Sequence, residues 1–300
     1  MRVRVLGSAA GGGLPQWNCA CRNCGLARRG VIPARTQSSV AASADGERWF
    51  LLNASPDLRA QIEAFPPLQP PPGTTRGSPI EGVLVTNADL DHTLGLFALR
   101  EGGGVRVHAS ETVRRSLGGG LNLDAVLGAF SGITWTLPPA TPEPLRRADG
   151  SASGLLYRAI PLSGKPPRFA RPGDDGEGHV LAYELTDVRT GGRLFFAPDV
   201  AELGAPLDAA LERADAVLFD GTFWSQTELI DLGAGHLSAD EMGHLPVSES
   251  LPLLVKRPSQ RRIYLHINNT NPMLDPDSPE HAAVQAAGIG VAEDGWEFEL

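Results

Sequence analysis

Short apolar runs are the feature that most constrains the fold of this chain. Each run has the length of a β-strand and is bounded by turn residues. Ten runs have this character: 2–7, 38–43, 48–53, 82–87, 105–110, 155–162, 179–185, 192–198, 216–221 and 262–267. Because several runs follow one another without a helix between them, the pattern predicts sheets that pack on each other, with helices outside.

Three segments carry helix signals. A Ser-Pro pair at 55–56 predicts a capped helix whose apolar residues share one face as far as Phe65. A second Ser-Pro pair at 278–279 predicts another helix, which Gly288 ends. Residues 93–101 have the spacing of a third, amphipathic helix.

Composition indicates one domain and excludes some partners. The hydrophobic fraction of 42% supports a substantial core, and no repeat or long Gly/Ser linker divides the chain, so a single domain over 1–300 is expected. Lys plus Arg number 26 against 35 for Asp plus Glu, giving a net charge of -9 that repels nucleic acid and anionic lipid. The first residues lack the apolar core of a signal peptide, and no run approaches the ~20 apolar residues of a membrane span. A cytoplasmic protein without membrane contact is therefore expected.

The three cysteines of the chain lie close together, in "NCACRNC" at 18–24. An odd number of thiols in so tight a spacing does not suit disulfides, whereas three sulfurs on one loop suit a tetrahedral zinc with a fourth ligand from elsewhere. We therefore expect Cys19, Cys21 and Cys24 to bind a structural Zn²⁺ in a reducing compartment. A redox site and a set of small buried residues are the alternatives.

Ionisable residues stand where four separate apolar runs end. They are Asp89, Asp91, His92, Asp199, Asp220 and His266. Burying several carboxylates together is costly unless a cation offsets their charge, so convergence of these strand ends predicts a metal centre. Taken alone, the Asp-x-Asp-His segment is equally compatible with a solvated turn.

Five longer segments make a resemblance specific. They are 7–24 ("GSAAGGGLPQWNCACRNC"), 86–96 ("TNADLDHTLGL"), 218–224 ("LFDGTFW"), 242–248 ("MGHLPVS") and 265–272 ("LHINNTNP"). Together they resemble the pyrroloquinoline quinone (PQQ) biosynthesis protein B family, a distal branch of the metallo-β-lactamase superfamily. The resemblance implies an α+β fold, the four-layer αββα sandwich, with a metal site at the edge where the two sheets meet.

The metal-binding loop departs from the superfamily pattern His-x-His-x-Asp-His. Asn87 and Asp89 replace its first two histidines, and Ser163 stands where a further histidine is expected. The superfamily's bridging aspartate corresponds to Asp199 and its last histidine to His266. A dinuclear zinc hydrolase would thus lack three imidazoles here.

The ligands that remain are His92, His266 and a carboxylate from Asp89, Asp91, Asp199 or Asp220. Two histidines and one carboxylate suit non-haem Fe²⁺, with Zn²⁺ or Mn²⁺ as the other candidates. The site expected to carry the chemistry is Asp91, His92 and His266.

The resemblance implies an iron-dependent, O2-using hydroxylase that acts on the tyrosine ring of a Glu-Tyr unit derived from a peptide. Two alternatives stay open: a carrier that binds finished PQQ for delivery or export, and a metal-dependent hydrolase. The cysteine loop is a candidate dimer contact, so a homodimer is among the expected assemblies.

Two further positions, Asn269 and His244, have more than one interpretation. In a related phosphodiesterase branch the fourth zinc ligand is a histidine, and Asn269 stands at that place here, so the zinc is expected to use another partner. His266 is a candidate for that role, although we assign it to the active site. His244 is a candidate pocket residue, with a helix cap or loop hydrogen bond as the alternative.

Overall fold

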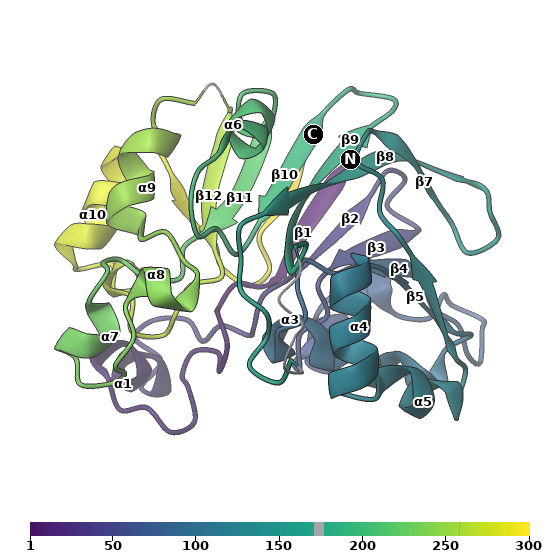
Figure 1. Cartoon of the computed structure of the whole chain (residues 1–300), viewed down its shortest axis with the longest axis horizontal. Coiled ribbons are helices and arrows are strands. Elements are labelled where there is room, and N and C mark those ends of the chain that lie inside the picture. The colour runs from purple at the N-terminus through teal and green to yellow at the C-terminus, as the bar shows by residue number, and fades with distance from the viewer. Residues whose placement is uncertain (171–176, 258) are drawn as a thin grey trace.

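The computed structural model describes residues 1–170, 177–257 and 259–300. The described chain forms two seven-stranded sheets packed face to face, with helices over both outer faces (Figure 1). In strand order, the first sheet contains β14 (Glu297–Glu299), β1 (Arg2–Gly7), β2 (Ser39–Ser43), β3 (Trp49–Leu52), β4 (Ile80–Leu84), β5 (Val105–His108) and β6 (Ile133–Thr136). The second contains β13 (Gly290–Val291), β12 (Arg261–Leu265), β11 (Ala216–Asp220), β10 (Arg193–Ala197), β9 (Val180–Asp187), β8 (Ala152–Leu162) and β7 (Glu143–Arg146).

Helices cover the outer face of each sheet. The α-helices are α1 (Arg22–Arg28), α2 (Leu58–Ala64), α3 (Leu90–Thr93), α4 (Glu111–Gly120), α5 (Leu123–Gly128), α6 (Ala205–Leu211), α7 (Glu228–Asp231), α8 (Ala239–Met242), α9 (Val247–Leu254) and α10 (Pro279–Ala286). The 3-10 helices are η1 (Pro66–Leu68), η2 (Leu94–Glu101) and η3 (Pro272–Leu274). No described helix has both the length and the apolar character needed to cross a bilayer.

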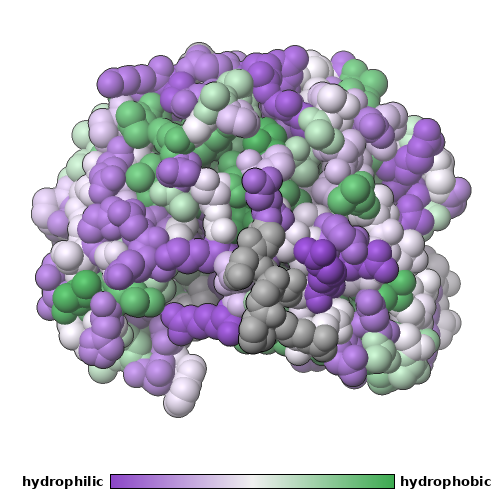
Figure 2. Space-filling model, in the orientation of Figure 1, coloured by the Kyte–Doolittle hydropathy of each residue, from purple (hydrophilic) through white to green (hydrophobic). Residues whose placement is uncertain are grey.

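Side chains that alternate between the two faces of each sheet form three apolar layers. Phe196 of β10 packs between the sheets, in the same cluster as Phe50 and Tyr183, whereas its neighbour Phe195 packs under the helices of the second sheet. Successive side chains of a strand point to opposite faces, and both faces are covered here, so β10 is apolar from Leu194 to Ala197. The third cluster lies between the first sheet and its helices. The predicted four-layer αββα sandwich is confirmed, and hydrophilic residues cover most of the face in Figure 2.

The sequence identified ten of the fourteen described strands. All ten predicted runs contain strands, whereas β6, β7, β13 and β14 were not predicted. The helix after Ser278 is confirmed, because the Ser278 side chain accepts a hydrogen bond from the His281 amide.

Two helix predictions need correction. The helix predicted from Pro56 begins only at Leu58. Residues 55–58 first form a turn, in which the Leu58 amide donates to the Ser55 carbonyl and the Asp57 amide donates to the Ser55 hydroxyl. Segment 93–101 is mostly the 3-10 helix η2, and the Gly95 amide donates to the Ala54 carbonyl.

Parallel strands determine where the polar residues gather. β10, β11 and β12 run parallel as neighbours, so their carboxyl ends lie at one edge of the second sheet. β4 belongs to the other sheet, and the Leu181 amide of β9 donates to the Thr86 carbonyl just beyond it. The loops after these four strands therefore meet at one end of the sandwich, the usual place for a binding site.

Candidate metal centres

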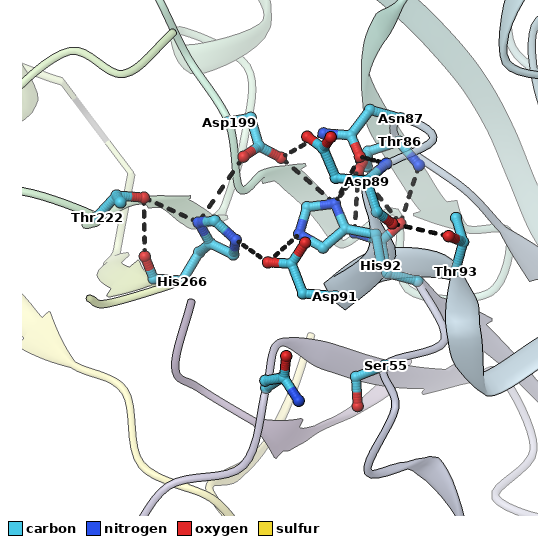
Figure 3. A network of polar contacts seen from close by, with 12 residues as sticks. Ser55, Thr86, Asn87, Asp89, Asp91, His92, Thr93, Asp199, Thr222 and His266 are labelled. Atoms are coloured by element: carbon cyan, nitrogen blue, oxygen red, sulfur yellow. Dashed lines mark hydrogen bonds and ion pairs between the residues drawn. The ribbon is translucent and has the colours of Figure 1, made fainter. Parts of the chain in front are cut away.

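Four strand ends supply the first candidate centre. Asp199 follows the end of β10, Asp220 is the last residue of β11, and His266 directly follows β12. After β4, a short loop leads into α3, which carries Asp91 and His92. Figure 3 shows His266 and His92 approaching from opposite sides with Asp91 between them.

Asp91 and the two imidazoles converge on one point. Asp91 Oδ2 lies 3.1 Å from His266 Nε2 and 3.9 Å from His92 Nε2. The ligand atoms of the three residues lie within 4.8 Å of one another. His92 Nε2 is buried and has no hydrogen-bond partner among the described residues. A buried nitrogen left without a partner beside a carboxylate and a second imidazole fits a metal ion.

The charges of this group favour a cation. Burial opposes ionisation of Asp91, but His92 and His266 hold the pKa of its carboxyl well below its usual range. Burial likewise opposes a charged His266, yet Asp199 and Asp91 raise its pKa to about 9. Without a metal, His266 therefore carries the compensating positive charge at neutral pH, and a divalent cation would displace that proton.

Thr222 determines which nitrogen of His266 faces Asp91. The Thr222 hydroxyl donates to Asp220 Oδ1 at 2.6 Å and lies 2.8 Å from His266 Nδ1. Because its proton is used on the carboxylate, its oxygen accepts from Nδ1–H, and Nε2 is turned to Asp91. His266 also has a left-handed φ of 56°, a costly backbone conformation for a residue with a side chain.

The other predicted carboxylates lie outside the Asp91 group. Asp89 is exposed at the rim, and Asp220 is fully buried, with its oxygens bonded to Thr222 and His244. Asp199 lies 3.5 Å from His92 Nδ1, on the side of the ring away from the unpartnered nitrogen. Of the four candidate carboxylates, the structure brings Asp91 to the two Nε2 atoms.

His244 is a site residue that strand patterns do not identify. It follows α8 and Gly243, whose left-handed φ of 89° turns the chain back toward β10. Its Nδ1 lies 2.8 Å from Asp220 Oδ2, and its ring stacks on His266 at 5.7 Å. Burial opposes its charge, but Asp220 raises the pKa of His244. The signal available in the sequence was segment 242–248, one of the five that carry the family resemblance.

His244 does not complete a second open metal site. Asp199, His244 and His266 also have ligand atoms close together. However, the nitrogens nearest Asp199 are the two Nδ1 atoms, at 3.9 Å for His244 and 3.8 Å for His266. Both already contact protein oxygens, so this group is a hydrogen-bonded support beside the Asp91 group.

The three cysteine sulfurs form the second candidate centre. Cys21 is the N-cap residue of α1 and Cys24 lies in its first turn. The start of the helix therefore brings both sulfurs toward Cys19. Asn269 Nδ2 lies 3.2 Å from the Cys19 sulfur, 3.5 Å from that of Cys21 and 3.3 Å from that of Cys24. The amide of Asn269 thus occupies the fourth corner of a tetrahedron whose other corners are sulfurs.

The fourth zinc ligand stays a prediction, and the structure adds Asn269 to the candidates because its side chain faces the three sulfurs. His266 points to Asp91 and does not contact the sulfurs, so the two centres do not compete for it. Asn23 of α1 secures the arrangement, because its side chain donates to the carbonyls of Asn269 and Asn271 at 3.0 and 2.9 Å.

Comparisons with known proteins agree with this architecture. The family model described as a beta-lactamase superfamily domain matches residues 48–267. Coenzyme PQQ synthesis protein B of Azotobacter vinelandii is 44% identical over 308 residues, and that of Methylococcus capsulatus is 41% identical over 313 residues; each alignment covers 100% of both chains.

Solved structures extend the comparison to the fold. A Zn²⁺-bound PqqB from Methylobacterium extorquens superposes with a TM-score of 0.89 at 38% identity, covering 100% of both chains. A diphosphatase from the PhnP family has a TM-score of 0.70 at 19% identity, covering 100% of this chain and 97% of its own, which shows a shared fold.

Proposed function

This chain belongs to the coenzyme PQQ synthesis protein B family of the beta-lactamase superfamily, with a role in PQQ biosynthesis, and we propose that it is a metal-dependent hydroxylase using iron and O2. Its substrate is a tyrosine ring in a Glu-Tyr unit derived from a peptide. The observation that carries the proposal is the convergence of Asp91, His92 and His266 on one point.

The ligand set distinguishes this proposal from hydrolysis. The residues present are two imidazoles and one carboxylate, and Asn87, Asp89 and Ser163 stand where the superfamily has further histidines. Fe²⁺ held by two histidines and one carboxylate supplies O2 activation. Nε2 of each histidine and Oδ2 of Asp91 would hold the metal, while Thr222 and Asp220 fix the ring of His266.

Ring hydroxylation requires a reductant. Insertion of one oxygen atom into a ring C–H bond uses O2, two electrons and two protons, and it releases one water. His244 is a partly buried imidazole beside the metal ligands, held by Asp220, and its raised pKa suits it to exchange protons during this reaction.

The test is reconstitution of the metal-free protein with Fe²⁺ under anaerobic conditions. On addition of O2, a chemical reductant and a Glu-Tyr dipeptide, we expect a product heavier by one or two oxygen atoms, detected by mass spectrometry with ¹⁸O2. Absence of any oxygenated product with Fe²⁺, Mn²⁺ or Zn²⁺ would reject the hydroxylase. Cleavage of phosphodiester or lactam substrates by the zinc-loaded protein would favour a hydrolase.

The carrier function is tested with the same protein. PQQ binding that is equally tight after His92→Ala and His266→Ala substitution would favour a carrier, because a carrier needs no active-site metal.

A separate zinc ion at the cysteine centre completes the proposal. Its ligands are Cys19, Cys21, Cys24 and the side-chain oxygen of Asn269. The two ends of an amide are similar in size, so a half-turn of the Asn269 side chain brings the oxygen to the corner now facing all three sulfurs. A closed shell of this kind leaves no position for a substrate, which makes the role of the zinc structural.

A further inference from the structure

Asn87 occupies the place of the superfamily's first histidine, yet it lies deep between residues of the metal centre. Only 3% of its surface is exposed. Its side chain makes three polar contacts: Oδ1 with the Asp89 amide and with His92 Nδ1, each at 3.0 Å, and Nδ2 with Asp199 Oδ2, also at 3.0 Å. Both ends of the Asn87 amide are thus held by neighbouring residues of the site.

Two of these contacts fix the orientation of the amide. The backbone N–H of Asp89 is only a donor, so the Asn87 atom facing it is the oxygen. Asp199 Oδ2 accepts from the other end of the amide at 3.0 Å, so the Asn87 atom facing it is the NH2 group. Both partners require the same orientation.

The orientation of Asn87 decides the proton position on His92. Because Asn87 Oδ1 accepts, His92 Nδ1 must carry the proton that it donates. Asp199 Oδ2, a second acceptor, lies 3.5 Å from the same Nδ1. Nε2 is then left with a lone pair, and this is the buried atom without a hydrogen-bond partner that faces Asp91.

A second hydroxyl near the ring must be considered. Thr86 Oγ1 lies 3.2 Å from His92 Nδ1, but it also lies 3.2 Å from Asn53 Oδ1, an acceptor for its proton. Thr86 Oγ1 accepts from Asn53 Nδ2 at 2.9 Å. Its proton is therefore directed away from the ring, and Asn87 is the nearer contact of His92 Nδ1.

We propose that Asn87 is a positioning residue: its oxygen holds His92 in the Nδ1–H tautomer, and its NH2 group holds Asp199, so that His92 Nε2 is ready to bind the metal. This role rests on the metal site of the proposed function and deepens it. Asn87 stands at the place of the superfamily's first histidine and orients His92 instead of binding the metal. Metal-binding histidines usually require such an outer-shell partner.

The test compares three variants of the metal-free full-length chain by long-range ¹H–¹⁵N NMR of the histidine rings. In the native protein we expect His92 Nδ1–H with an unprotonated Nε2. Asn87→Leu keeps the volume and removes the acceptor, and we expect a mixture of tautomers and a loss of active-site Mn²⁺ affinity of about 10–100-fold. Asn87→Asp keeps an acceptor for His92, and we expect the native tautomer.

Thr86→Val is the matched control, because it removes a different oxygen near His92 Nδ1 and keeps Asn87, so it should leave the tautomer unchanged. His281, whose Nδ1 contacts the Met273 carbonyl at 2.8 Å, is an internal reference for correct folding in every spectrum. A native tautomer and native Mn²⁺ affinity in folded Asn87→Leu, or tautomer loss in Thr86→Val alone, would overturn the proposal. These spectra need no iron or O2, so a failure of the hydroxylase assay leaves their result readable.

Discussion

In His92 and in His266, Nδ1 forms a hydrogen bond with a protein oxygen and Nε2 faces Asp91. The supporting oxygens come from Asn87 and from Thr222, which is itself held by Asp220. Side chains without any metal contact therefore determine the geometry of the centre. Such outer-shell partners commonly change metal affinity by about 10–100-fold when they are removed.

Removing either imidazole should empty the active site and leave the cysteine centre filled. We expect His92→Ala and His266→Ala each to lower active-site metal affinity by more than the ~10–100-fold typical of an outer-shell partner, because a ligand atom itself is lost. Elemental analysis after dialysis against a weak chelator measures both metals. His281 lies outside both centres, so the control variant His281→Ala should keep both metals. Loss of the cysteine-bound zinc in His92→Ala would contradict the separation of the two sites.

At the scale of elements, the segment after β12 joins the two centres. It carries His266 to Asp91 and, three residues on, Asn269 to the cysteine sulfurs. Asn23 of α1 holds the carbonyls of Asn269 and Asn271, and Thr270 donates to Glu228 of α7. The segment is thus fixed by two helices as well as by the sulfurs.

Loss of the cysteine centre should therefore weaken the active site only moderately. We expect Cys24→Ser to release the zinc and to lower active-site metal affinity by less than about 10-fold, because Asn23 still holds the segment. Metal analysis and Mn²⁺ titration measure the two effects. Ala20→Ser, an exposed change between two of the cysteines, serves as control. Complete loss of active-site binding in Cys24→Ser would show that the segment depends on the zinc.

Glu228 makes the stability of this region depend on pH. Burial raises its pKa to about 7, even though Thr270 and the Trp224 amide donate to its carboxylate. The protonated form is favoured in the folded state, so its stabilising effect is present below about pH 4.5 and is lost as pH rises through about 7.

Glu228→Gln should abolish the loss of stability at high pH, because the glutamine side chain cannot ionise. We expect the variant to be more stable than the native protein at pH 8 by up to about 3 kcal/mol, and similar to it near pH 5. Urea unfolding at the two pH values measures the difference. Equal stability changes at pH 5 and pH 8 would mean that ionisation of Glu228 has no part in the effect.

At the scale of the molecule, one apolar layer joins both sheets. Phe50, Tyr183 and Phe196 belong to the same cluster although they come from β3, β9 and β10. This shared layer supports the prediction of a single domain over 1–300.

Deleting a ring from this layer should destabilise the whole chain. We expect Phe196→Ala to lower the free energy of unfolding by about 3–5 kcal/mol. Val126→Ala, at an exposed helical position, should change it by less than about 0.5 kcal/mol. Circular dichroism and tryptophan fluorescence during denaturant unfolding should shift together in Phe196→Ala. Two separate transitions, only one of them shifted, would argue against a single domain.

Local sequence patterns predicted the buried strands and the site residues at the ends of these strands. Apolar runs predicted the long buried strands, because both faces of those strands are covered, and their polar ends predicted Asp91, His92 and His266 as neighbours. β7 was missed because most of its residues are exposed and carry no apolar run. The start of the helix predicted from Pro56 was wrong because the chain first makes a turn between Ser55 and Leu58.

The remaining site residues, His244 and Asn269, could be placed only from tertiary contacts in the folded chain. His244 reaches the centre through the turn at Gly243, and its partner Asp220 is distant in sequence. Asn269 was set aside because a histidine was expected there, and only the folded chain shows its amide facing all three sulfurs. Neither contact has a local sequence pattern that predicts it.

X-ray absorption of the protein loaded with zinc and then, anaerobically, with Fe²⁺ tests the two-centre account most directly. At the iron edge we predict nitrogen and oxygen neighbours with the outer scattering of two imidazoles and no sulfur. At the zinc edge we predict three sulfurs at about 2.3 Å and one lighter atom. Sulfur around the iron, or imidazole scattering around the zinc, would contradict the assignment of His92 and His266 to a centre separate from the cysteines.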